Sequence, residues 1–247
     1  MSIIATTFHP SRAGSIGLCL SAEALSRFFD GMTTALIWDC DGVLVDSEKH
    51  SCSAWLPVLA RRGIDVDLDY IERFIGRSDG AVLEDLKRRT GQTLDVDDLL
   101  EERQLEYFRL AEGATDPFPG LPALLAQFRA EGVPLAVASS GRLAKIRFSL
   151  AQAGLDDCFD ILCSATEVAQ GKPAPDLFLL AAKRLGVAPS ECAVIEDSVP
   201  GLQGAIAAGM RPLGFTSSHS ASVLREAGAE ITFESYDELR GILSTNE

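Results

Sequence analysis

The sequence lacks several features that would point to particular classes of protein. Its 247 residues include only three histidines and six cysteines. No two cysteines form a C-x-x-C pair, so the usual pattern of a zinc site is missing. We interpret the cysteines as reduced thiols of a cytoplasmic protein. No apolar run approaches the roughly 18 residues that a membrane-spanning helix needs, so we expect no membrane partner.

Positive charge is also scarce. The chain has 22 Lys and Arg against 36 Asp and Glu, a formal net charge of -14. This charge repels phosphate backbones and anionic membranes, so we expect no nucleic-acid partner. A small anionic substrate stays compatible with it if a metal ion and a few cations reverse the sign locally. The sequence shows no exposed apolar stripe, and we expect a monomer or a weak dimer.

The second half of the chain alternates two kinds of segment. Strand-like segments cover residues 133–140, 159–165, 192–198 and 210–215. Segments with helical periodicity lie between them, and several end at a glycine, which readily adopts a left-handed cap. This alternation is typical of an α/β fold, a doubly wound parallel sheet with helices on both faces.

An insertion separates the first strand from the rest of the predicted sheet. The apolar segment Thr34–Trp38 has the character of a sheet strand, but the next strand begins only near Val133. Connections inside α/β units are typically about 2 to 6 residues. We therefore predict a small all-helical domain at 47–116, inserted into an α/β core formed by 32–46 and 117–247. Residues 1–31 are interpreted as an N-terminal extension, with Met32 as a candidate start.

Charged and hydroxyl side chains follow the predicted strands. In open parallel sheets, ligands bind beyond the carboxyl ends of the strands, where these side chains should gather. Four carboxylates without histidine or cysteine suit a hard divalent cation, and Mg²⁺ fits best. The set comprises Asp39, Asp41, Gly42, Ser139, Ser140, Lys172, Glu196 and Asp197.

These residue types suit phosphoryl transfer. Asp39 can attack phosphorus to give an aspartyl phosphate, while Asp41 can protonate the leaving oxygen and later deprotonate water. Gly42 permits a sharp turn that presents a backbone N–H. Ser139 can hold phosphoryl oxygens, and Lys172 supplies positive charge for the transition state.

Four segments in this order resemble the motifs of the haloacid dehalogenase superfamily, in the subgroup with a helical cap inserted after the first motif. They are "DCDGVLVDSE", "ASSGR", "GKPAPDLF" and "IEDSVPG", and the resemblance covers nearly everything from Met32 onward. It implies that Asp39 is the nucleophile, that Asp41 is the acid/base and a Mg²⁺ ligand through its carbonyl, and that Glu196 and Asp197 complete the metal site. Ser139, with its neighbour Ser140, and Lys172 would hold the phosphate.

The cap loop adds one further candidate. The caps of this family direct a loop at the substrate, and Arg77 in "FIGRSDG" lies in such a loop. Arg77 is therefore a candidate for substrate binding, although a solvated arginine is the simpler interpretation.

Three functions are compatible with the motifs. The first is a Mg²⁺-dependent phosphatase acting on a small phosphorylated sugar or sugar acid. The second is a sugar phosphomutase similar to β-phosphoglucomutase, but such mutases place a histidine and an arginine where this chain has Ser51 and Asp79. The third is a non-catalytic phospho-acceptor similar to a receiver domain, but receivers lack the insertion and the second aspartate.

Overall fold

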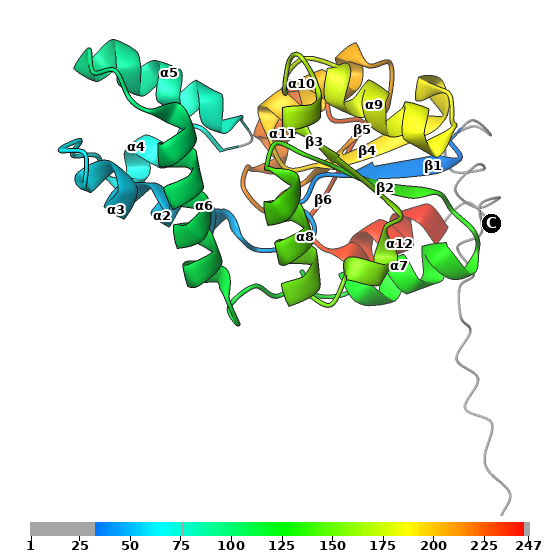
Figure 1. Cartoon of the computed structure of the whole chain (residues 1–247). Helices are drawn as coiled ribbons and strands as arrows, with labels where there is room; N and C mark the ends of the chain where they lie inside the picture. The colour runs from blue at the N-terminus through cyan, green and yellow to red at the C-terminus, as the bar shows by residue number, and fades with distance from the viewer. Residues whose placement is uncertain (1–32, 76, 245–247) are drawn as a thin grey trace, which may run out of the picture.

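A single parallel sheet forms the centre of the molecule. The computed structural model describes residues 33–75 and 77–244, so the predicted extension 1–31 lies outside the described residues. Within these ranges the sheet has the strand order β3-β2-β1-β4-β5-β6 (Figure 1). The doubly wound α/β fold is therefore confirmed. The strands are β1 Ala35–Trp38, β2 Leu135–Ser139, β3 Ile161–Ser164, β4 Cys192–Glu196, β5 Arg211–Phe215 and β6 Ile231–Phe233.

The chain winds outward in both directions from β1. It pairs in parallel with β2 on one side and with β4 on the other. The order of the strands thus reverses at β1, and such reversal points are where open α/β sheets bind ligands. The edge strand β6 was not among the predicted strands, because three residues carry too little apolar pattern to stand out in the sequence.

Helices cover both faces of the sheet. Alternate residues of β1 point to opposite faces, so Leu36 and Trp38 enter one buried cluster while Ala35 and Ile37 enter the other. Burial on both faces explains why the strand is continuously apolar. The first cluster packs against α7 Leu121–Ala130, α8 Leu143–Gln152 and α12 Tyr236–Ser244, and the second against α9 Asp176–Leu185 and α10 Val199–Ala207.

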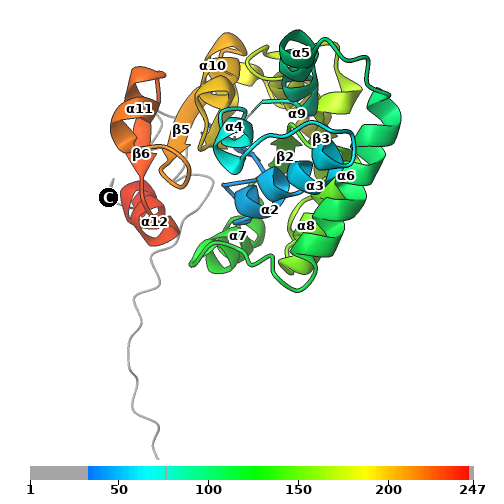
Figure 2. The ribbon, with the colours of Figure 1, turned by 90° about the vertical axis from the view of Figure 1, so that its left-hand side faces the viewer.

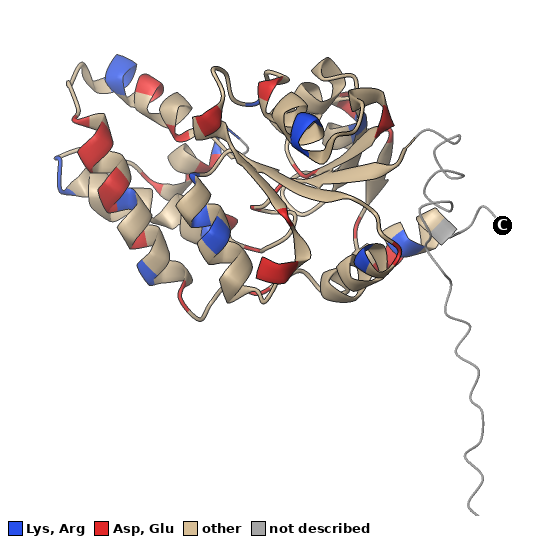
Figure 3. Ribbon diagram, turned by 45° about the vertical axis from the view of Figure 1, so that its right-hand side comes forward, with Lys and Arg blue, Asp and Glu red and all other residues tan. Residues whose placement is uncertain are grey.

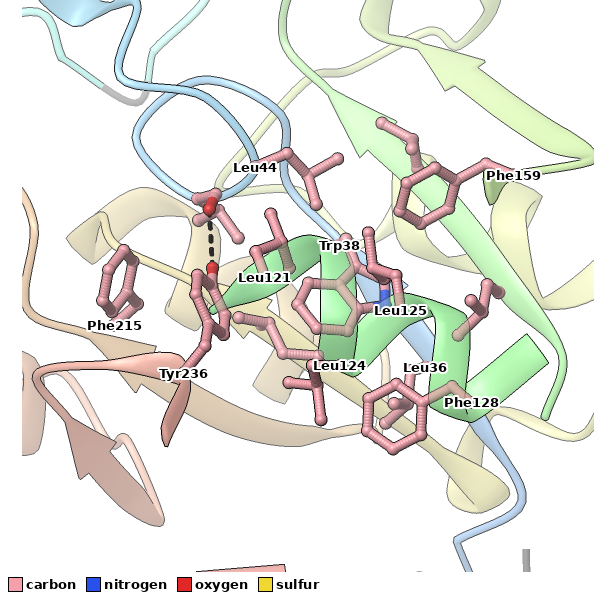
Figure 4. Close-up of a cluster of buried hydrophobic side chains, with 14 of the residues drawn as sticks. Leu36, Trp38, Leu44, Leu121, Leu124, Leu125, Phe128, Phe159, Phe215 and Tyr236 are labelled. Carbon is pink, nitrogen blue, oxygen red and sulfur yellow. Dashed lines mark hydrogen bonds between the residues drawn. The ribbon is translucent and has the colours of Figure 1, made fainter. Parts of the chain in front are cut away.

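Trp38 fixes the centre of the first cluster. Its ring lies 6.3 Å from the ring of Phe128 and 6.0 Å from that of Tyr236 (Figure 4). Full burial of each such side chain stabilises the fold by roughly 1.5–3 kcal/mol. Tyr236 also donates from its hydroxyl to the carbonyl oxygen of Val43 at 2.6 Å. The last helix is thereby joined to the loop that carries the "DCDGV" motif.

In the described part of the chain, five helices lie between β1 and α7 and form a separate layer (Figures 1 and 2). They have their own buried cluster, which includes Trp55, Tyr70 and Leu86. Asp95 begins the last of them by accepting a hydrogen bond from the backbone N–H of Asp98. These helices, together called the helical layer, are α2 Glu48–Ser53, α3 Trp55–Ala60, α4 Leu68–Glu72, α5 Asp79–Thr90 and α6 Val96–Ala111.

Charged pairs join the helices of this layer to one another. Arg61 and Arg62, which directly follow α3, both bond to Glu102 of α6. Acidic and basic positions are interspersed along these helices (Figure 3). No described helix combines the length and apolar character needed to cross a bilayer.

The two ends of the helical layer leave the core side by side. Val45 forms an antiparallel bridge with Pro117, and Phe118 donates its N–H to the carbonyl oxygen of Leu44 at 3.3 Å. The division of the chain at 47 and 116 into a core and an inserted domain stays a prediction.

Candidate active site

Predicted site residues lie at the carboxyl ends of three strands, β1, β2 and β4, and therefore at the same end of the sheet. Asp39 directly follows β1 and donates its backbone N–H to the carbonyl oxygen of Ile195 on β4 at 3.0 Å. Ser139 and Glu196 are the last residues of β2 and β4. Because parallel strands end at a common edge, residues from distant parts of the chain become neighbours.

Lys172 joins two of the carboxylates. Its ammonium nitrogen lies 2.5 Å from Asp39 Oδ1 and 2.5 Å from Glu196 Oε1. Burial lowers the pKa of Lys172, but the negative charges of Asp39 and Glu196 raise it more, so the net pKa lies above its usual value. The side chain therefore stays charged in a place where only 5% of its surface is exposed.

Carboxylate oxygens of Asp39, Glu196 and Asp197 lie within 4.8 Å of one another in the buried site. The net pKa of Asp39 is raised to about 8. Burial is the largest cause, the charge of Glu196 adds to the rise, and the charge of Lys172 opposes it. Burial and the charge of Glu196 raise the pKa of Asp197 well above its usual value. One ammonium group does not neutralise three carboxylates, so the donor set fits a hard divalent cation bound through oxygen.

Glu196 is the member of this group with the most contacts. Its Oε1 accepts from Lys172, and its Oε2 accepts from the hydroxyl of Ser198 at 2.8 Å and from the backbone N–H of Asp197 at 3.2 Å. These bonds hold the loop after β4 and orient Lys172. Asp39 and Asp197 keep more of their oxygen lone pairs available for a metal ion.

Gly42 lies tightly against Asp197. Its φ of 76° is in the left-handed region, and a Cβ atom there would lie 2.1 Å from Asp197 Oδ2. Both facts require glycine. Ser217 and Ser218, which follow β5, donate hydrogen bonds to Asp197 Oδ2. The sequence prediction missed these serines, although extending the search to the end of β5 would have found them.

Asp41 has a different electrostatic environment from Asp39. The ammonium of Lys145 lies 2.8 Å from Asp41 Oδ2, and the hydroxyl of Ser47 donates to Oδ1. Burial raises the pKa of Asp41, but Lys145 and these hydrogen bonds lower it more, and the net pKa lies below its usual value. Lys145 was not among the predicted site residues, because a lysine within a helical segment is usually solvated.

A pocket lies between the core and the helical layer. On the core side Asp39, Asp41, Ser139 and Ser140 line it. The residues that line it on the other side include Arg77, whose role in substrate binding stays a prediction. They also include Arg103, Glu48, Trp55 and Phe74, which were not among the predicted site residues. The catalytic roles assigned from the sequence stay predictions. Five of the nine predicted residues line this pocket, namely Asp39, Asp41, Ser139, Ser140 and Arg77. The other four belong to the buried charge cluster or to the turn that packs against it, namely Lys172, Glu196, Asp197 and Gly42.

Comparison with known proteins gives the class of this protein. A family model for haloacid dehalogenase-like hydrolases matches residues 33–209. The chain belongs to this family. A solved hydrolase from Pseudomonas syringae has the same fold, with a TM-score of 0.75 and 30% sequence identity over 85% of this chain and 97% of that one.

Curated relatives narrow the class further. The fructose-1-phosphate phosphatase of Escherichia coli is 32% identical over 71% of this chain and 92% of its own length. The β-phosphoglucomutase of Bacillus subtilis is 35% identical over 73% of this chain and 82% of its own length. The chloroplastic SUPPRESSOR OF QUENCHING 1 of Arabidopsis thaliana is 36% identical over 80% of this chain, which spans only 19% of that protein. The predicted family and the predicted enzyme class, a phosphatase of the haloacid dehalogenase type, are confirmed.

Proposed function

We propose that the protein is a Mg²⁺-dependent phosphatase that hydrolyses small phosphorylated sugars or sugar acids through an aspartyl phosphate on Asp39. The observation that carries this proposal is the position of Lys172 between Asp39 and Glu196, beside a pocket that also contains Asp41. A nucleophilic carboxylate, a fixed cation and a second carboxylate for proton transfer are the groups that phosphoryl transfer needs.

In the first step, an oxygen of Asp39 forms a bond to phosphorus while the bond from phosphorus to the substrate oxygen breaks. Lys172 holds the other Asp39 oxygen, Oδ1, and so fixes the carboxylate. Ser139 at the end of β2 lines the pocket next to Asp39 and can bind a phosphoryl oxygen. Asp41 gives a proton to the leaving oxygen, and the negative phosphoryl group favours this protonated form of Asp41.

In the second step, water attacks phosphorus and Asp41 accepts a proton from it. The low pKa of Asp41 keeps the side chain ionised once the leaving group has gone, which is the form that a general base requires. Lys145 and Ser47 hold the carboxylate in place during both steps. The phosphate is then released and Asp39 is free again.

Asp39 and Asp197, with the backbone carbonyl of Asp41, would hold the Mg²⁺ ion. The ion would neutralise the crowded carboxylates and the charge of the phosphoryl group. Glu196 would act mainly by orienting Lys172 and the loop after β4. We further propose that the helical layer is the cap that excludes water from the pocket, and that the protein works in the cytoplasm.

A sugar phosphomutase is the second candidate, because one relative carries that name. The side chains at the two distinguishing places support hydrolysis instead. Ser51 accepts hydrogen bonds from Arg103 and Lys145, and Asp79 pairs with Arg103. Neither residue can act as the histidine or the arginine of such a mutase.

The experiment is a phosphate-release assay on a panel of sugar phosphates with Mg²⁺. Asp39→Asn should lower kcat by about 10⁴-fold or more, because an amide cannot form the phosphorylated intermediate. Asp46→Asn, an exposed aspartate of the same loop, is the matched control and should keep wild-type turnover. Full turnover by Asp39→Asn would disprove the proposed nucleophile.

The same assay separates the alternatives. Conversion of glucose 1-phosphate to its 6-isomer without release of phosphate would show a mutase. A phosphorylated protein that lasts for hours without turnover would show a phospho-acceptor module.

A further inference from the structure

Two buried cations meet in the pocket beside Asp41. Arg103 from α6 and Lys145 from α8 are 7% and 6% exposed, and both line the pocket. Both also donate to one oxygen, Ser51 Oγ, from Arg103 Nη2 at 2.9 Å and from Lys145 Nζ at 3.1 Å. Like charges held this close repel each other and lose hydration, so folding alone does not favour the arrangement.

Among the described residues, the hydrogen bonds of Arg103 are incomplete. The one carboxylate that pairs with Arg103 among the described residues is that of Asp79, at 3.4 Å. The Nε atom of Arg103 is buried and has no hydrogen-bond partner within the described part of the chain. A buried guanidinium with a distant counter-ion and an unused donor is costly unless something else completes it.

Lys145 pairs with Asp41 at 2.8 Å. Glu48 also lines the pocket, but within residues 33–75 and 77–244 it forms no ion pair with either cation. Aromatic faces support both cations from the helical layer: the Arg103 guanidinium lies 5.1 Å from the ring centroid of Trp55, and the Lys145 ammonium 4.6 Å from that of Tyr107. The two charges are therefore held firmly in place. Each has one carboxylate partner within the described part of the chain, and the Nε donor of Arg103 stays open there.

We propose that Arg103 and Lys145 bind a second anionic group of the substrate, a carboxylate or a second phosphate, while the transferred phosphoryl group lies at Asp39. This inference rests on the proposed function and narrows it to phosphorylated sugar acids and sugar bisphosphates over neutral sugar phosphates. A guanidinium suits this role because its fixed donors match carboxylate and phosphate oxygens.

The test compares substrates that differ by one anionic group. In the carboxylate arm, gluconate 6-phosphate is compared with glucitol 6-phosphate, which has a hydroxymethyl group instead of the carboxylate. In the phosphate arm, fructose 1,6-bisphosphate is compared with fructose 1-phosphate. We expect the wild type to favour the more highly charged member of at least one pair by about 10- to 100-fold in kcat/KM, because a site built for a charged group rejects a substrate that lacks it. The arm that shows the preference identifies the second group.

Variants of Arg103 locate the preference. Arg103→Gln should reduce the ratio within the preferred pair by about tenfold, and Arg103→Lys, which keeps the charge, should retain part of it. The matched control is Arg109→Gln, which removes an exposed charge from the same helix and should leave the ratio unchanged. Thermal unfolding shows whether each variant is folded.

Two results would overturn the inference. One is a wild-type ratio near one in both arms, which decides the question even if the variants fail to fold. The other is an Arg103→Gln variant that slows both members of a pair equally. Absence of phosphate release from all four compounds and from acetyl phosphate would instead overturn the proposed function, and with it this inference.

Discussion

The two walls of the pocket handle charge differently. On the core wall, Lys172 lies between Asp39 and Glu196 at 2.5 Å from each, and hydroxyl and backbone groups hold Glu196 and Asp197. On the opposite wall, Arg103 has one carboxylate partner among the described residues, at 3.4 Å, and shares the Ser51 hydroxyl with Lys145.

This difference separates chemistry from specificity. Electrostatic catalysis needs charges that are already in position before the substrate arrives, and the core wall meets that need. Substrate selection needs polar groups that find their last hydrogen-bond partner only in the correct ligand. On the opposite wall, the Nε atom of Arg103 is such a group within the described part of the chain. Substitutions in each wall test this contrast.

Lys172→Met should damage the core wall most. It removes the positive charge proposed to stabilise the transition state, and kcat should fall about 10²- to 10³-fold. It also leaves Asp39 and Glu196 without their buried cation, and the free energy of unfolding should fall by about 3 kcal/mol. Phosphate release and denaturant unfolding measure the two effects.

The control for that variant is Lys183→Met, an exposed lysine of α9. Its unfolding free energy should stay within about 0.5 kcal/mol of the wild type. Equal stability of the Lys172 and Lys183 variants would show that the buried charges are not coupled as described.

Gly42→Ala should have an intermediate effect. The new methyl group would overlap Asp197 Oδ2, and the left-handed backbone adds about 1–2 kcal/mol of strain. We expect activity to fall at least tenfold because Asp197 must move, which the phosphate-release assay detects. Gly91→Ala is the matched control, because Gly91 has a φ of 69° with open space around it. It should lose stability alone, and loss of activity in both variants would contradict this reasoning.

Tyr236→Phe should have the smallest effect. It leaves the buried carbonyl oxygen of Val43 without its hydroxyl donor, at a cost of about 1–2 kcal/mol in unfolding free energy. Turnover should change little, because the hydroxyl does not line the pocket. Tyr107→Phe is the informative comparison, since that hydroxyl joins α6 to Ser149 on α8 at 2.7 Å. Tyr107→Phe should alter KM more than Tyr236→Phe, because α6 and α8 carry Arg103 and Lys145. A larger change of KM in Tyr236→Phe would show that the core wall of the pocket is the more deformable one.

The sequence was most informative where strand ends carry the chemistry. Parallel strands bring their carboxyl ends together in any such fold, so Asp39, Ser139, Lys172 and Asp197 could be grouped from the order of the strands alone. The strand β6 was missed because it has only three residues, of which Ile231 and Thr232 are partly exposed. The first helical segment of the predicted domain 47–116 is divided into α2 and α3, since Pro57 has no N–H to donate to the carbonyl oxygen of Ser53.

The pair of cations beside Asp41 could not be predicted in this way. Arg103 and Lys145 lie within amphipathic helices, where the default expectation for a basic side chain is solvent. Their burial depends on how α6 packs against α8, with Tyr107, Phe108 and Phe148 between them. Such packing depends on tertiary contacts that no local pattern in the sequence encodes.

The paired entry and exit of the helical layer have a consequence for how new enzymes arise on this scaffold. Leu44 accepts a hydrogen bond from the N–H of Phe118, and Asp46 donates its N–H to the carbonyl oxygen of Asp116. The entry and the exit of the helical layer are therefore joined by bonds that do not involve the helices between them. Selection can therefore exchange one substrate for another by changing the helical layer beyond α2, which leaves in place the contacts of Ser47 and Ser51 with the site.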